Sequence, residues 1–103
     1  MDQIQRIQEM EACLDLSARA VGELSRALDT YEEAQKAYRK LYDYYGSARW
    51  MKDYEDDEKG KLPATLKRGV LSEDAVYDLI MEHRYLQLRM MKILTKNMEK
   101  GLV

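Results

Sequence analysis

The chain has 103 residues, of which 35% are charged, and its 17 Lys and Arg against 19 Asp and Glu leave a net charge of −2. This length suits one domain with a modest core, and so small a charge excludes both a polyanionic tail and the strongly basic surface of most nucleic-acid-binding domains. With one cysteine, no signal-like start and no run of ~20 apolar residues, the sequence predicts a single cytoplasmic domain over residues 1–103, without a membrane segment.

A heptad pattern predicts a first helix over about residues 3–46, which Gly46 ends. Its a and d positions form an apolar stripe that is wider than a two-stranded coiled-coil seam requires, because small residues also fill the g positions. The first turns of this stripe hold Ile7, Met10, Leu14 and Val21. Gly22 is the residue least favourable to this helix, because glycine lowers helix stability by about 1 kcal/mol relative to alanine. If the helix broke there, one chain would close a three- or four-helix bundle by itself.

Tyrosine occurs eight times and phenylalanine never. Four of these tyrosines line the lower half of the first helix: Tyr31, Tyr38, Tyr42 and Tyr45. Each ring offers apolar area and a hydroxyl that needs a partner. The pattern is typical of a semi-polar packing layer, and a groove for a peptide or ligand is the alternative.

Ser47 is placed to cap a short second helix over about residues 47–59. Trp50 and Tyr54 recur on it at helical spacing, and Gly60 and Pro63 end it and open a loop over residues 60–71.

An acidic run, residues 53–58, occupies the end of this second helix. It fails the calcium-loop pattern, because Glu58 stands where the loop requires glycine. It is then either a solvated helix face or a docking surface for a cationic partner. Because a helix C-terminus disfavours negative charge, we expect an ion-paired clasp between the run and Lys67 or Arg68. The candidate contact residues here are Trp50, Asp53, Asp57, Lys67 and Arg68.

A third helix is predicted over about residues 72–99, with Ser72 as its N-cap and Glu73 and Asp74 in its first turn. Leu71 and Val76 are spaced as a hydrophobic staple across that cap. The helix carries two apolar stripes, one beginning at Val76 and the other at Tyr77. The fold class is therefore all-α: a long N-terminal helix, a short middle helix and a long C-terminal helix, packed as an antiparallel helical hairpin or bundle.

Little in the sequence indicates catalysis. His83 and Cys13 fall at apolar helical positions and are interpreted as packing residues, and one of each does not make a zinc site. No glycine-rich phosphate loop is present. We therefore expect no enzyme activity, no catalytic residue, no metal and no cofactor. Four cations form a stripe late in the third helix: Arg89, Lys92, Lys96 and Lys100. Their interpretation as charges that complement the helix dipole is favoured over nucleic-acid binding.

Three blocks carry a resemblance to a known family: Tyr44 to Glu55, Gly60 to Pro63, and Leu66 to Leu79, whose K-R-G-V-L-S-E-D stretch is the most specific. They are similar to the small bacterial helical proteins of domain-of-unknown-function family 4298. The resemblance implies a bacterial, stand-alone cytosolic protein. It transfers no active-site residue.

The function predicted from these features is a small helical protein-interaction module that self-associates as a homodimer through its coiled-coil-like first helix. At about 1.5 Å per residue the first helix outruns the third by roughly 25 Å, which leaves apolar surface for a second chain to cover. The alternative is a regulator or inhibitor that binds nucleic acid, or a protein that handles it, through the acidic run or the basic stripe.

Overall fold

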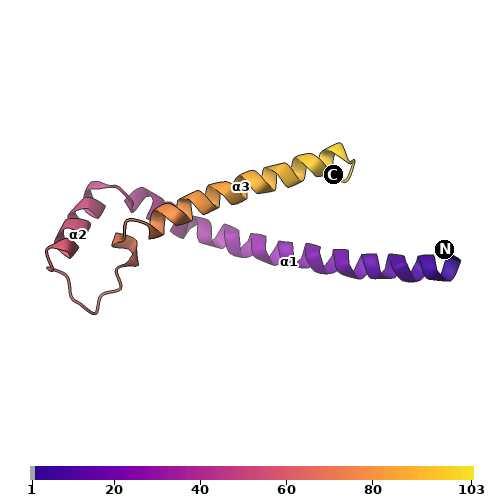
Figure 1. The fold of residues 1–103 in the computed structure, drawn as a ribbon, viewed down its shortest axis with the longest axis horizontal. Helices are drawn as coiled ribbons and strands as arrows, with labels where there is room; N and C mark the ends of the chain where they lie inside the picture. Colours follow the sequence, from indigo (N-terminus) through magenta and orange to yellow (C-terminus); the bar gives the residue numbers. More distant parts are fainter. Residues whose placement is uncertain (1) are drawn as a thin grey trace. The chain divides into compact units, whose positions relative to one another are not determined.

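The computed structural model describes residues 2–103, and the regular structure within them is helical, without a strand. The elements in chain order are α1 (Gln3–Tyr44), α2 (Ala48–Glu58), the short 3-10 helix η1 (Gly69–Leu71) and α3 (Ala75–Glu99) (Figure 1). This confirms the predicted all-α class and the order of a long, a short and a long helix.

The chain divides into two compact parts, the first ending at Arg39 and the second spanning Lys40–Val103. The first part is a single segment of α1. The second holds the last turns of α1 with α2, η1 and α3. The predicted single domain and the antiparallel pairing of the long helices stay predictions.

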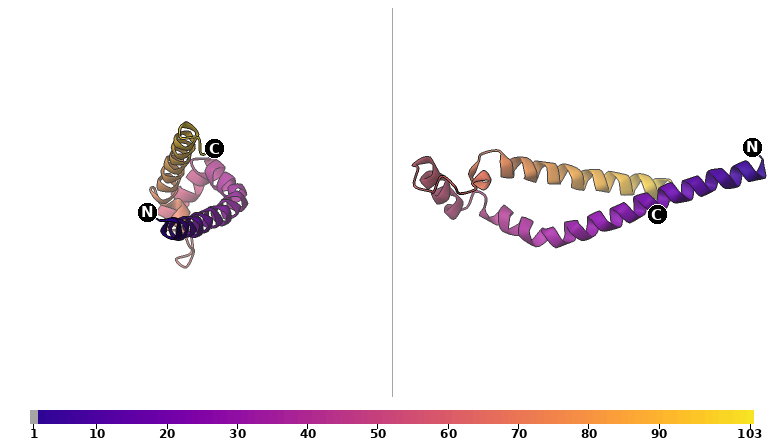
Figure 2. Two further views of the ribbon diagram at one scale, coloured as in Figure 1. Left: turned by 90° about the vertical axis from the view of Figure 1, so that its right-hand side faces the viewer. Right: turned by 90° about the horizontal axis from the view of Figure 1, so that it is seen from below.

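α1 begins at a capping box that the sequence analysis did not identify. The Asp2 carboxylate accepts a hydrogen bond from the Gln5 backbone N–H at 2.7 Å, and the Gln5 side-chain oxygen accepts one from the Asp2 N–H at 3.3 Å. The helix then runs through Gly22 to Tyr44 without interruption (Figure 2), so the alternative of a break at Gly22 is wrong.

α2 begins and ends as its sequence predicts. The Ser47 hydroxyl accepts a hydrogen bond from the Trp50 N–H at 3.2 Å. At the other end Gly60 has a φ of +69°, the left-handed conformation that closes a Schellman motif. In this motif the N–H of Lys61 donates to the carbonyl of Asp56 at 2.9 Å, and the N–H of Gly60 to that of Asp57 at 3.0 Å.

The small core of the second part forms where η1 meets α3. It consists of Leu71, Val76 and Ile80, which are 6%, 4% and 9% exposed. Leu71 and Val76, the residues expected to form a hydrophobic staple, are both buried, although the helix begins at Ala75 and the two residues do not flank its N-cap in the way that motif requires.

The start of α3 differs from the prediction by three residues. The Ser72 hydroxyl does accept a hydrogen bond from the Ala75 N–H at 3.2 Å, as a cap would, but it also donates to the carbonyl of Gly69 at 2.8 Å. Ser72 therefore closes η1, and the helix begins at Ala75. Glu73 and Asp74, expected inside the first turn, lie in the turn before it.

Candidate functional site

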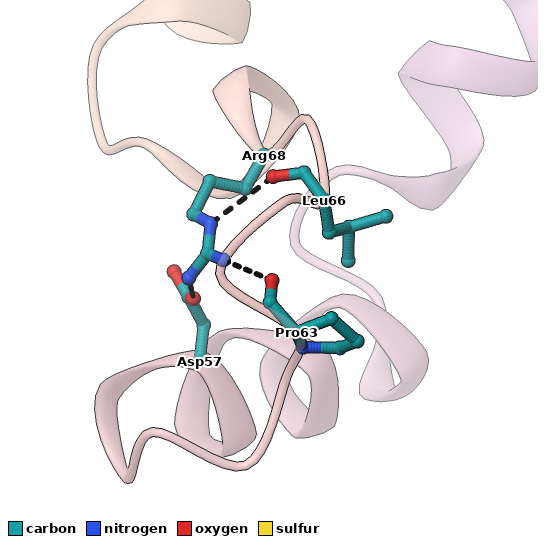
Figure 3. A network of polar contacts seen from close by, with 4 residues as sticks. All are labelled: Asp57, Pro63, Leu66 and Arg68. Carbon is teal, nitrogen blue, oxygen red and sulfur yellow. Dashed lines mark hydrogen bonds and ion pairs between the residues drawn. The ribbon is translucent and has the colours of Figure 1, made fainter.

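The second part of the chain gathers its polar contacts around α2 and the loop that follows it. Arg68 is the centre of one network (Figure 3). Its Nη1 binds the carboxylate of Asp57, its Nη2 donates to the carbonyl of Pro63 at 2.5 Å, and its Nε donates to the carbonyl of Leu66 at 3.3 Å. The planar guanidinium suits this task because its N–H groups point in fixed directions, toward the carboxylate and two carbonyls.

This network confirms the ion pair expected between the acidic run and the loop. The structure places it at Arg68, whose side chain is 34% exposed, against 20% for Asp57. Lys67, the other candidate, is exposed. The guanidinium of Arg68 reaches the carbonyls of Pro63 and Leu66 as well as the carboxylate of Asp57, because its N–H groups are spread over a planar group. The ammonium of a lysine carries its N–H groups on one atom and does not offer this spread.

Asp56 is held by two lysines, one on each side of the helix end. Lys52 lies one turn earlier at 3.2 Å, and Lys61 follows the Schellman motif at 4.0 Å. Exposed pairs of this kind contribute little individually, about 0.5 kcal/mol each. They nevertheless supply positive charge where the dipole of α2 is unfavourable for Asp56.

Asp53 accepts a hydrogen bond from the hydroxyl of Tyr44 at 2.5 Å, which joins α2 to the last turn of α1. Burial, the hydrogen bond to Asp53 and the negative charge of Asp53 together raise the pKa of Tyr44 to about 12. Tyr44 therefore stays protonated and acts as a donor well into the alkaline range.

Trp50 is the centre of an aromatic cluster. Its ring stacks on Tyr54 at 5.2 Å with an interplanar angle of 21°, and meets Tyr45 edge-on at 5.2 Å and 71°. Its indole N–H donates to the carbonyl of Val70 in η1 at 3.0 Å. The predicted contact residue Trp50 thus links α2 to η1.

Tyr54 and Glu73 are contact residues that the sequence analysis missed. The Tyr54 hydroxyl donates to the Glu73 carboxylate at 3.0 Å, and the Tyr45 hydroxyl to the backbone carbonyl of Glu73 at 3.4 Å. Hydrogen bonds with Glu58 and Glu73 raise the pKa of Tyr54 to about 12. The spacing of Tyr54 and Glu58, one helical turn, could have indicated the first of these contacts. No local signal indicates Glu73, which lies 19 residues away.

The remaining predicted interaction residues lie on α1 in the first part of the chain. They are all exposed: Ile7 53%, Met10 53%, Leu14 60% and Val21 67%. The structure thus groups Trp50, Asp53, Asp57 and Arg68 in the second part. The stripe on α1 is made by the other four residues: Ile7, Met10, Leu14 and Val21. Cys13 is also exposed on α1.

The profile of the family described as Domain of unknown function (DUF4298) matches residues 7–93. The chain belongs to this family. The resemblance drawn from the sequence is therefore confirmed. The match includes the whole of α2, the loop, η1 and most of both long helices of this DUF4298 chain. No curated protein and no solved structure matches it.

The chemistry of the site in this DUF4298 chain is that of a structural junction. Carboxylates of the acidic run are engaged by Arg68, by lysines and by tyrosine hydroxyls. Within residues 2–103 no three His, Cys, Asp or Glu side chains are grouped as metal ligands. In the same range, no helix has the length and apolar character needed to cross a membrane.

Proposed function

We propose that this chain is a cytoplasmic, non-enzymatic helical interaction module that forms a homodimer through the apolar stripe of α1. The observation that supports this is the exposure of Ile7, Leu14 and Val21, each more than half accessible on α1, which is the one helix among the described residues of the first part. Large contiguous apolar surface on a small protein usually marks an interface.

Helix lengths support the same proposal. α1 has 42 residues, α3 has 25 and α2 has 11. At about 1.5 Å per residue, roughly 25 Å of α1 exceeds the length of α3. A hairpin within one chain would leave that excess uncovered, and a second chain can supply what is missing.

The pattern along α1 favours another helix as the partner. Apolar residues at a and d positions insert between the side chains of a facing helix, and small residues beside them let the two backbones approach closely. Small side chains fill successive g positions: Ala20, Ala27 and Ala34. In a two-fold pair each chain contributes the same surfaces, so the pair closes without further growth.

The alternative function, binding of nucleic acid or of a protein that handles it, has less support. It could use the acidic run or the late basic stripe of the third helix. Support for the acidic run is weaker, because Asp53, Asp56 and Asp57 are each engaged by a neighbouring side chain.

Light scattering coupled to size-exclusion chromatography tests the homodimer. We expect a dimeric mass at micromolar concentration, and Leu14→Asp should weaken dimerisation at least about a hundredfold, because each copy would bury an unpaired charge. Ala12→Asp is the matched control: it adds the same charge to the same helix at the heptad position farthest from the stripe. A monomeric mass for the wild type, or equal effects of the two substitutions, would contradict the proposal.

A further inference from the structure

α3 carries two apolar faces, and only the start of the first is buried; farther along that face Leu86, Met90 and Ile93 are 40%, 39% and 48% exposed. The first begins with Val76 and Ile80, which are buried with Leu71 in the core of the second part. The second face runs along the other side of the helix and stays exposed. Its members are between 43% and 64% accessible: Tyr77, Met81, Tyr85, Leu88 and Met91.

Cations lie within and beside the later half of this exposed face. Arg84, Lys92 and Lys96 are separated from Leu88 by multiples of four residues, so they fall on the same side of the helix. Each is exposed, and within residues 2–103 none of them forms an ion pair with a carboxylate. We call this surface the basic face of α3: Arg84, Tyr85, Leu88, Met91, Lys92 and Lys96.

The stripe of α1 has flanking charges of the opposite sign. Glu11 occupies the e position beside Ile7, and Asp15 follows it by four residues at the b position, so both carboxylates lie on the same flank of the stripe. Farther along, Asp29 at a b position and Glu32 at an e position continue this flank. All four are exposed. In paired helices, charges that flank an apolar seam decide which partner and which orientation are allowed.

The order of charges along the helices also fits one orientation. α3 has the carboxylates Asp78 and Glu82 near its start and cations near its end, and α1 likewise has Glu11 and Asp15 near its start and Lys36 and Lys40 near its end. Two helices with this arrangement match when they run antiparallel. Parallel packing would place like charges together.

We propose that the basic face of α3 binds the acid-bordered stripe of α1 from a second copy of the chain, in antiparallel orientation. This rests on the proposed homodimer and identifies the two surfaces that meet in it. Each copy presents one surface of each kind, so a two-fold pair makes two identical contacts and leaves neither surface free.

Two charge-reversal variants test this assignment. E11K/D15K makes the border of the α1 stripe basic, and K92E/K96E makes the basic face acidic. In a homodimer of either variant, both contacts bring like charges together, so we expect dimerisation to weaken at least about tenfold at low salt. A homodimer of R19E/R26E, which makes the same change of charge as K92E/K96E at f positions on the far side of α1, should keep the wild-type mass.

Mixing the two variants gives the deciding result. An E11K/D15K chain and a K92E/K96E chain oppose unlike charges at both contacts, so the mixture should form a heterodimer about as tightly as the wild type. Sedimentation velocity, with one chain extended by a tag, separates heterodimer from monomer. Circular dichroism checks that each variant keeps its helices.

Other outcomes overturn the assignment in distinguishable ways. Suppose that the mixture stays monomeric, and that a chain carrying all four substitutions regains the wild-type free energy of unfolding that each double variant had lost. The two surfaces then meet within one chain. If E11K/D15K pairs with wild type as well as it pairs with K92E/K96E, α1 contacts α1, and the homodimer survives without this assignment. A wild type that is monomeric refutes the homodimer itself.

Discussion

Arg68 joins the loop after α2 to the end of that helix by binding the carboxylate of Asp57 and two backbone carbonyls at once. Arg68→Glu should lower the free energy of unfolding by about 2 kcal/mol, because charge-assisted hydrogen bonds are lost and like charges then face each other. Urea denaturation followed by circular dichroism measures this. Lys67→Glu, the same charge change at the exposed neighbour, should stay within about 0.5 kcal/mol of wild type. If Arg68→Glu leaves both stability and its salt dependence unchanged, the clasp is not structural.

Trp50→Phe should destabilise the chain by about 1 to 2 kcal/mol. Phenylalanine keeps most of the stacking with Tyr54 but has no N–H for the carbonyl of Val70, which is left without that donor. Denaturant midpoints give the difference. Tyr77→Phe removes a hydroxyl from an exposed ring on α3 and serves as the near-neutral control. Equal midpoints for Trp50→Phe and Tyr77→Phe would show that the indole hydrogen bond contributes nothing.

Two glycine substitutions should act in opposite directions. Gly22→Ala places a Cβ only 3.6 Å from the side chain of Arg26, an ordinary contact inside a helix, and should stabilise by up to about 1 kcal/mol. Gly60→Ala forces a side chain onto a φ of +69° and should cost about 1 kcal/mol or more. Thermal unfolding of the two variants provides the comparison. A loss of stability in Gly22→Ala would mean that something beyond helix propensity acts there.

Alkaline pH should weaken the junction around α2. The pKa of Tyr44 and that of Tyr54 are each raised to about 12, whereas an unfolded tyrosine ionises near pH 10. Between these values the native state holds protons that the unfolded state has released, so stability falls as pH rises. The contribution is complete below about pH 10 and is lost by about pH 12.

Tyrosinate absorbance measures this directly. The wild-type titration should include a late phase near pH 12 from Tyr44 and Tyr54, and Y44F/Y54F should lose that phase. Y77F, which leaves both contacts in place, should keep it. A wild-type titration without a phase near pH 12 would contradict the assigned contacts.

The helices could be predicted because their signals are local. Heptad spacing predicted α1. The ends of α1 and α2 were predicted from Gly46 and Gly60, and both glycines adopt positive φ. Ser47 caps α2 as predicted. The start of α3 was missed by three residues, because the Ser72 hydroxyl contacts both Gly69 and Ala75 and so serves two elements at once.

The junction could be predicted only in part. The dipole argument required a cation for the acidic run and named Arg68 as one of two candidates. The hydrogen bonds from Arg68 to the carbonyl of Pro63 and from Trp50 to the carbonyl of Val70 could not be predicted. Every residue has a backbone carbonyl, so the residue type does not indicate which carbonyl accepts. Nor could the sequence pair Tyr54 with Glu73, which come together only after the loop has folded.

The exposed thiol of Cys13 affects how association must be measured. Two chains in an oxidising buffer can join through this thiol as a disulfide even when their helices do not pair, and a mass measured there would count the covalent species as a dimer. Reductant, or a Cys13→Ser chain, leaves only non-covalent association. Because the sequence has one cysteine, the same thiol accepts one spin label or fluorophore per chain without any mutation.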